Sequence, residues 1–153
     1  MLRTRILGTG AYAPDKILTN ADLERMVETS DAWIRERTGI VERRIAAPEQ
    51  ASSDLAVAAA ENALSSAGIT ADQLDLIIVA TVTPDTPLPS CAAYVQAKLG
   101  AKNAFAFDLV AACAGSLYAM SVADQFIQTG KVKRALVVGV ELLSRIVDWS
   151  DRN

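Results

Sequence analysis

Three near-continuous apolar runs stand out along the chain, and each has the length of a buried strand. They lie at about residues 74–82, 104–110 and 134–140. A run that is apolar at nearly every position is typical of a strand buried on both faces, as in a parallel or mixed central sheet. Segments with helical features alternate with these runs. The pattern therefore predicts the α/β class.

Capping residues mark where most of the expected helices begin. A serine or asparagine side chain can accept a hydrogen bond from the first helical turn, and glycine often follows the last turn. The expected helices are 21–28 capped by Asn20, 31–37 capped by Ser30, 52–66 capped by Ser52 or Ser53, 90–99 capped by Ser90, and 117–127. Short strands at 5–7 and 41–46 and a final loop at 144–153 complete the pattern. No linker, composition shift or repeat interrupts it, so we expect a single domain.

Cys113 lies where the second apolar run passes into the helix expected from about residue 117. Its neighbours are small, and a sharp strand-to-helix turn would expose its side chain at the helix N-terminus. The positive end of a helix favours a thiolate, the form in which cysteine acts as a nucleophile. Cys113 is therefore a candidate nucleophile, with a small buried thiol packed at a turn as the alternative. Cys91 has no such elbow, and we interpret it as a packing residue.

Composition narrows the function classes. The 153 residues are 51% hydrophobic and 22% charged, which is typical of a globular chain with a sizeable core. The net charge is −3 without a basic stripe, so a nucleic-acid partner is not expected. No apolar run approaches the about 20 residues of a membrane span, and the N-terminus lacks a signal-peptide core, so we expect a cytoplasmic protein without a membrane partner. With no histidine and two distant cysteines, we expect neither a metal site nor a disulfide framework.

Residues 8–13 match the loose dinucleotide pattern G-x-G-x-x-A. That site requires a helix to open at the last small residue, whereas Pro14 follows here. We therefore favour a turn shaped by glycine over a nucleotide site.

Both tryptophans, Trp33 and Trp149, lie among charged residues. An aromatic ring beside arginine suits stacking on a purine and pairing with phosphate. A tryptophan at the core or its rim is the alternative.

Eight short segments form an ordered set of motifs along the whole chain. They are ILGTG at 6–10, TNADLE at 19–24, TSDAWI at 29–34, RTGI at 37–40, FD at 107–108, AACAG at 111–115, SVADQ at 121–125 and DR at 151–152. In this order and at this spacing they resemble the N-terminal half of β-ketoacyl-acyl-carrier-protein synthase III, the initiating condensing enzyme of bacterial fatty-acid synthesis.

The resemblance implies a thiolase-like fold. Such a subunit has two similar α/β halves, each with a mixed five-stranded sheet and helices on both faces, packed as αβαβα. Residues 1–153 would be the N-terminal half-domain, with the C-terminal half outside this sequence. In the family that second half carries the catalytic histidine and asparagine, which would account for a chain without histidine. The family is normally a homodimer.

The resemblance also implies an activity. Cys113 would accept an acyl group from acyl-coenzyme A and condense it with malonyl-acyl carrier protein, releasing CO2. No cofactor is implied, because the coenzyme A thioester is a substrate. Two alternatives remain open: a non-catalytic thiolase-like module that binds acyl-coenzyme A or only dimerises, and a specialised relative that acylates another acceptor.

Five further positions match residues with roles in the family. Trp33 and Arg152 match the pair that sandwiches the adenine of coenzyme A, and Thr29 and Arg37 match positions at the same entrance. Leu88 matches a residue that the dimer partner contributes to the acyl pocket. One departure is Ser116, where the family commonly has phenylalanine.

Overall fold

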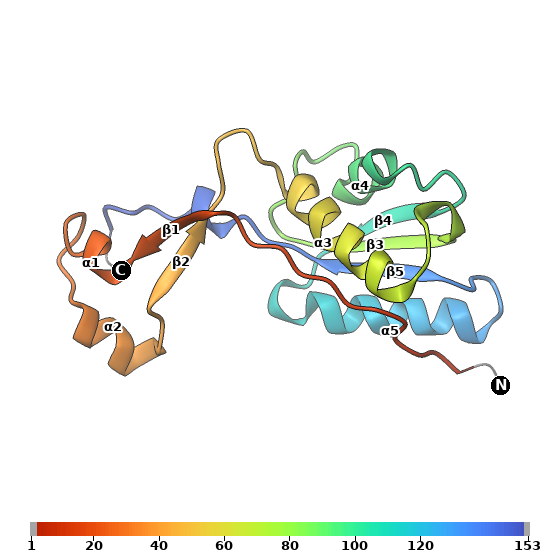
Figure 1. Ribbon diagram of the computed structural model, residues 1–153, viewed down its shortest axis with the longest axis horizontal. Helices are drawn as coiled ribbons and strands as arrows, with labels where there is room; N and C mark the ends of the chain where they lie inside the picture. The colour runs from red at the N-terminus through yellow and green to blue at the C-terminus, as the bar shows by residue number, and fades with distance from the viewer. Residues whose placement is uncertain (1–2, 152–153) are drawn as a thin grey trace. The chain divides into compact units, whose positions relative to one another are not determined.

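The computed structural model describes residues 3–151, which form two compact units (Figure 1). Unit 1 contains the chain up to Tyr12 together with Ala51–Glu141. Unit 2 contains Ala13–Gln50 together with the chain from Leu142 onward.

Three parallel strands form the sheet of unit 1, in the order β4-β3-β5. Their bounds are β3 Leu76–Ala80, β4 Phe105–Leu109 and β5 Ala135–Gly139. In the central strand, Ile78 pairs with Phe107 on one side and with Val137 on the other. Every side chain of β3 is buried. The prediction of a strand buried on both faces is therefore confirmed for β3.

Helices cover both faces of this sheet (Figure 1). They are α3 (Ser52–Ala67) and α4 (Cys91–Leu99) on one face and α5 (Gly115–Gln128) on the other. Ile77 and Val79 pack with α3 and α4, whereas Leu76 and Ile78 pack with α5. Each fully buried aliphatic side chain of this kind contributes about 1.5–3 kcal/mol to folding. The predicted α/β class with helices on both faces is confirmed.

Unit 2 contains a separate antiparallel pair of strands. They are β1 (Lys16–Thr19) and β2 (Glu42–Ile45), with α1 (Asn20–Leu23) and α2 (Asp31–Thr38) between them in the chain. The five strands found in residues 3–151 are thus divided between two sheets, and a single mixed five-stranded sheet is not formed there. The physical reason is polarity: β1 (KILT) and β2 (ERRI) carry charged or polar residues at five of their eight positions, and none of their side chains is fully buried, so these strands are unsuited to the core of a sheet covered on both faces.

The predicted strand at residues 5–7 is wrong, because no strand pairing includes this extended segment in the described structure. The segment that follows it approaches α3 closely. A Cβ atom at Gly8 would lie 2.7 Å from the Ala63 carbonyl oxygen, and one at Gly10 would overlap the Ala59 carbonyl oxygen. Glycine is needed here for close packing on a helix, and the next element is β1. No helix opens within the described residues 8–15, where a dinucleotide site would require one.

Most predicted helix ends are confirmed. The Ser30 hydroxyl accepts a hydrogen bond from the Trp33 N–H, and Ser90 caps α4 in the same way. Left-handed glycines end α2, α3 and α4; they are Gly39, Gly68 and Gly100. Residues 3–151 also include three short 3-10 turns, at Ala71–Gln73, Ala112–Ala114 and Leu143–Arg145.

Two caps differ from the prediction. Helix α1 has only four residues, and its cap is Thr19, whose hydroxyl accepts from the Asp22 N–H. Helix α3 follows Ala51, and Ser52 and Ser53 are buried inside its first turn. Each of these side chains finds tertiary partners that local propensity does not reveal.

Candidate functional site

Cys113 lies on a tight turn between β4 and α5, and its side chain is exposed. The chain leaves β4 after Leu109, passes through the 3-10 turn Ala112–Ala114 and enters α5 at Gly115. Ala112 has φ +44°, the only positive φ of a non-glycine residue in the described part of the chain. Such a conformation stores about 1–3 kcal/mol of strain and is found at sites where a side chain must be presented. The predicted sharp turn is confirmed.

Close packing brings the first turn of α5 onto the ends of two strands. A Cβ atom at Gly115 would lie 3.0 Å from the Ala80 Cβ at the end of β3. A Cβ atom at Gly139, at the end of β5, would overlap the Ser116 Oγ. Cys113 is therefore held beside the carboxyl ends of the sheet, the edge where open α/β sheets bind their ligands.

The electrostatic setting of this turn favours negative charge. The N-terminal end of a helix carries partial positive charge, and no acidic residue lies in the first turn of α5 to oppose it. An exposed thiol at such a position can act as a nucleophile toward an electrophilic carbonyl.

Cys91 has the opposite surroundings. Its side chain is fully buried at the start of α4, and its Sγ lies 3.6 Å from an Asp85 carboxylate oxygen. Burial raises the pKa of the Cys91 thiol to about 12, and the carboxylates of Asp85 and Asp108 add to the increase. The interpretation of Cys91 as a packing residue is confirmed.

Asp85 and Asp108 are the residues that sequence analysis missed in unit 1. The Asp108 carboxylate, in β4, accepts the N–H groups of Cys91 at 2.8 Å and Ala92 at 2.7 Å. Asp85 accepts the Ser53 N–H at 2.8 Å and the Ser53 hydroxyl. The FD motif at 107–108 is the only sequence signal for Asp108, and it does not reveal the contact with α4; no motif contains Asp85.

These contacts anchor the loop at residues 81–90, which carries Leu88. The Ser52 hydroxyl donates to the Thr83 carbonyl oxygen at one end of this loop, and the Thr86 hydroxyl donates to the Pro89 carbonyl oxygen near the other. Leu88 itself is 87% exposed. On this anchored loop its apolar side chain is available for contact with another surface.

In unit 2 the structure brings together Trp33 and Arg37, both on α2. The Arg37 guanidinium lies 5.0 Å from the centroid of the Trp33 ring, within cation–π distance. Thr29, half-buried, directly precedes Ser30, the residue that caps this helix. Arg152 lies outside the described residues.

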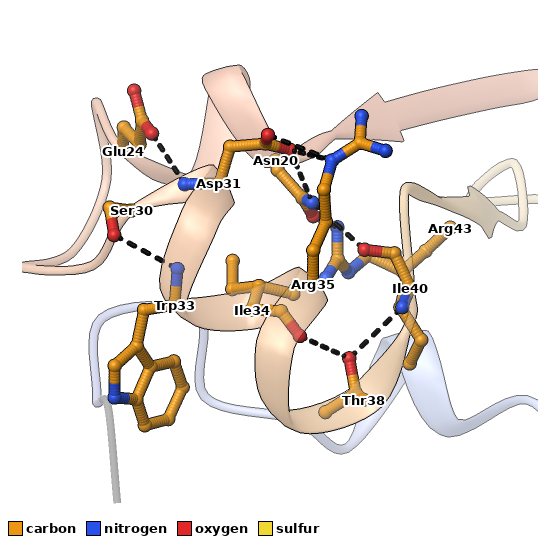
Figure 2. Close-up of polar contacts among 10 residues, drawn as sticks. All are labelled: Asn20, Glu24, Ser30, Asp31, Trp33, Ile34, Arg35, Thr38, Ile40 and Arg43. Atoms are coloured by element: carbon orange, nitrogen blue, oxygen red, sulfur yellow. Dashed lines mark hydrogen bonds and ion pairs between the residues drawn. The ribbon is translucent and has the colours of Figure 1, made fainter.

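A buried polar cluster centred on Asn20 stabilises the other side of α2 (Figure 2). Asn20 is 2% exposed, and its side-chain amide donates to Asp31 at 2.8 Å and to the Ile40 carbonyl oxygen at 2.9 Å. Hydrogen bonds from Arg35 and then Asn20 lower the pKa of Asp31. Sequence analysis treated Asn20 as a helix cap and so missed this cluster.

Residues 3–151 contain neither a candidate metal site nor a candidate membrane span. No group of three or more cysteine, aspartate or glutamate side chains could hold a metal ion there. None of the helices in this part of the chain has the length and hydrophobicity needed to cross a membrane.

The sequence of this chain is similar to a family of acyl-carrier-protein synthases. The profile of the family described as 3-oxoacyl-[acyl-carrier-protein (ACP)] synthase III matches residues 107–153. The β-ketoacyl-[acyl-carrier-protein] synthase III of Caldanaerobacter subterraneus is 58% identical over 148 residues, 97% of this chain and 45% of that relative. The enzyme of the same name from Ehrlichia canis is 55% identical over 153 residues, all of this chain and 48% of the relative.

Solved structures give the same result. The crystal structure of 3-oxoacyl-[acyl-carrier-protein] synthase III from Aquifex aeolicus is 54% identical, with a TM-score of 0.94 over 97% of this chain and 48% of that chain. The priming β-ketosynthase of the R1128 polyketide pathway is 37% identical, with a TM-score of 0.93 over 97% of this chain and 44% of that one. The chain spans about half the length of the curated relatives it matches.

Proposed function

Because this chain belongs to the 3-oxoacyl-[acyl-carrier-protein] synthase III family, we propose that it supplies the nucleophile of a condensing acyltransferase of fatty-acid initiation. Cys113 accepts an acyl group from acyl-coenzyme A and passes it to a malonyl-acyl carrier protein. The observation that carries this proposal is the exposed Cys113 thiol on a strained turn at the N-terminus of α5.

The first half-reaction uses groups that this chain contains. The Cys113 thiolate attacks the thioester carbonyl of acyl-coenzyme A, a new C–S bond forms, and the bond to the coenzyme A sulfur breaks, releasing its thiolate. The Cys113 backbone N–H can join an oxyanion hole for the tetrahedral intermediate. The N-terminal end of α5 places partial positive charge and no acidic residue beside the reacting sulfur.

The second half-reaction requires groups outside this sequence. Malonyl-acyl carrier protein loses CO2, and the resulting carbanion attacks the acyl thioester, so that Cys113 leaves as a thiolate and a β-ketoacyl product forms. The histidine and asparagine that assist decarboxylation in the family would come from the C-terminal half. Residues 1–153 are then the N-terminal half-domain of the complete enzyme. The exposed apolar side chains on α5, Leu117 (64%) and Tyr118 (58%), support such a partner surface.

Coenzyme A would bind in unit 2 through its adenine. Trp33 is 39% exposed and lies beside Arg37, so it can offer a flat apolar surface in a cationic setting. Arg152 would close the adenine sandwich, and Thr29 would line the same entrance. Leu88 would reach the acyl pocket of the second subunit in a homodimer, which its exposure on an anchored loop supports.

A second candidate is a specialised relative that acylates another acceptor. The structural similarity to the priming β-ketosynthase of a polyketide pathway favours it, as does Ser116 at a position where the resembled family commonly has phenylalanine. Comparing the rate of condensation with malonyl-acyl carrier protein and with other acceptors separates the two candidates.

Acyl-enzyme mapping tests the proposed nucleophile directly. The full-length synthase containing these residues is incubated with acetyl-coenzyme A, digested and analysed by mass spectrometry. We expect an acetyl group on the peptide that contains Cys113, lost in Cys113→Ser and retained in the matched variant Cys91→Ser. An acetyl group on Cys91, or none on Cys113, would overturn the proposal.

A further inference from the structure

The side chain of Asn20 uses its hydrogen-bonding groups to join separate parts of unit 2 (Figure 2). Its two amide donations reach Asp31, the first residue of α2, and the Ile40 carbonyl oxygen just beyond the end of that helix. Its carbonyl oxygen accepts a hydrogen bond of 2.7 Å from Arg43, in β2. One buried amide therefore connects both ends of α2 to the strand that follows it.

The contacts continue around the first turn of α2. The Asp31 carboxylate receives the Arg35 Nε at 2.8 Å, and the Asp31 N–H donates to Glu24 at 2.7 Å. The Ser30 hydroxyl accepts the Trp33 N–H at 3.2 Å. Hydrogen bonds with Glu24 and Ser30, which precede α2, and with Arg35 within α2 thus fix the helical turn that contains Trp33.

The last turn of α2 is fixed in the same manner. The Thr38 hydroxyl donates to the Ile34 carbonyl oxygen at 2.7 Å and accepts the Ile40 N–H at 3.1 Å. Ile34 is 7% exposed and packs the helix inward, whereas the Trp33 ring points away from the polar cluster (Figure 2). The cluster and the indole ring therefore lie on different sides of α2.

We propose that Asn20 is a positioning residue for the coenzyme A site, because it holds α2 in the place where Trp33 and Arg37 can receive adenine. This inference rests on the proposed function, which assigns adenine to Trp33. The Trp33 ring is exposed, so its position depends on the position of α2. Stacking depends on the position of a flat ring, and a shift of about 1 Å in a binding group can cost as much as 10²-fold in rate.

The test compares Asn20→Ala with the unchanged full-length synthase. We expect the KM for acetyl-coenzyme A and the dissociation constant of coenzyme A to rise about tenfold, as for the loss of a buried hydrogen-bonding group. The kcat at saturating acetyl-coenzyme A should change less than about twofold, because Asn20 does not act on the reacting atoms. Hydrogen exchange of residues 30–40 should become faster.

Two variants distinguish positioning from general stability. Thr19→Ala removes the cap of α1 beside Asn20 but no contact to α2, so it should lower stability without changing the KM. The exchange Asn20→Asp with Asp31→Asn restores a donor and an acceptor between the two positions. It should recover part of the affinity that Asn20→Asp alone loses by placing its carboxylate against that of Asp31.

The outcomes separate this inference from the proposed function. If Trp33→Ala weakens coenzyme A binding but Asn20→Ala leaves it within twofold, the positioning role is wrong and the adenine site stands. If Trp33→Ala leaves the affinity unchanged, the adenine site itself is wrong, and the positioning role falls with it. Should Asn20→Ala not fold, Arg43→Met removes only the outer donor, and the same split between KM and kcat is expected at about threefold. A fall in kcat without a change in KM would overturn the inference in either variant.

Discussion

The carboxylate of Asp108 and the backbone N–H of Cys91 lie 2.8 Å apart, which ties the end of β4 to the start of α4. The same carboxylate also accepts the Ala92 N–H at 2.7 Å, so one side chain satisfies two orphan donors of the helix. Asp108 stands five positions before Cys113 in the chain. Strand β4, which leads to the exposed Cys113, is therefore hydrogen-bonded to α4, the helix that contains the buried Cys91.

We expect Asp108→Asn to lower the free energy of unfolding by about 1–2 kcal/mol, since an amide can offer an acceptor to only one of the two N–H groups. Denaturant unfolding of the full-length protein measures this change. Asp72→Asn, at an exposed position, is the matched control and should stay within about 0.5 kcal/mol. Equal effects of the two substitutions would contradict the bracing role of Asp108.

The two cysteines should differ sharply toward a thiol-alkylating reagent. With a pKa of about 12, Cys91 remains protonated between pH 6 and 9 and is also buried, so it should stay unmodified in the native protein. Cys113 is exposed and should be alkylated first. Mass mapping after brief treatment with iodoacetamide reports both sites, with the unfolded protein as the control in which both react. Native alkylation of Cys91 at a rate similar to Cys113 would refute this difference.

Stability should fall at alkaline pH because of Cys91. Its pKa is raised from 9.0 to about 12 in the folded state, so between these values the unfolded chain releases a proton that the folded chain retains. The free energy of unfolding should then decrease as pH rises, by at most about 1.4 kcal/mol per pH unit. Below pH 9 the contribution is fully present. Unfolding curves at several pH values should show a shallower slope in Cys91→Ala, and an unchanged slope would count against the assignment.

The contact between Gly139 and Ser116 can be tested by a pair of substitutions. Gly139→Ala places a methyl group against the Ser116 Oγ, and we expect a loss of about 1–3 kcal/mol together with slower acylation of Cys113. Ser116→Ala should relieve most of the loss, because the Ser116 Cβ would lie at an ordinary 3.5 Å. A double-mutant cycle on stability and on acylation rate measures the coupling. Additive effects would mean that the two residues do not meet.

Residues 1–153 alone should not catalyse condensation, because they contain the proposed nucleophile Cys113 but no histidine. These residues should also bind a hydrophobic dye through exposed side chains such as Val110 (74%) and Leu117 (64%). Turnover with acetyl-coenzyme A and malonyl-acyl carrier protein and dye fluorescence measure the two properties, with the full-length synthase as the reference. Turnover equal to that of the reference would disprove the need for a second half.

Sequence patterns were most informative where burial alone decides structure. The central strand β3 and the capped ends of α2 and α4 were predictable from apolar runs, serine and glycine. The elbow at Cys113 was predictable because small residues separate a strand from a helix. The thiolase-like α/β fold, inferred from eight ordered motifs, is confirmed by the similarity to solved synthases.

The remaining features depend on contacts between distant residues. Asparagine is a common helix cap. The hydrogen bonds of Asn20 with Ile40 and Arg43, about 20 positions away, outweigh this local preference. Nothing local shows that Asp108 would cap a helix beginning 17 positions before it. Residues 5–7 have strand character, yet the glycines that follow bring the segment onto α3. Such choices are made by tertiary packing, which a single sequence does not display.

The left-handed backbone of Ala112 limits how the turn before Cys113 can be altered. Glycine at this position would relieve the steric strain of about 1–2 kcal/mol that an alanine methyl group imposes at φ +44°. It would also enlarge the conformational freedom of the unfolded chain by a comparable amount, so the net stability would hardly change. With glycine at position 112, however, the turn would sample a wider range of φ and ψ angles. At residue 112, glycine would remove the steric strain but allow more backbone conformations, whereas alanine restricts the backbone and keeps the strain. A fixed position of the Cys113 thiol therefore depends on a strained residue next to it.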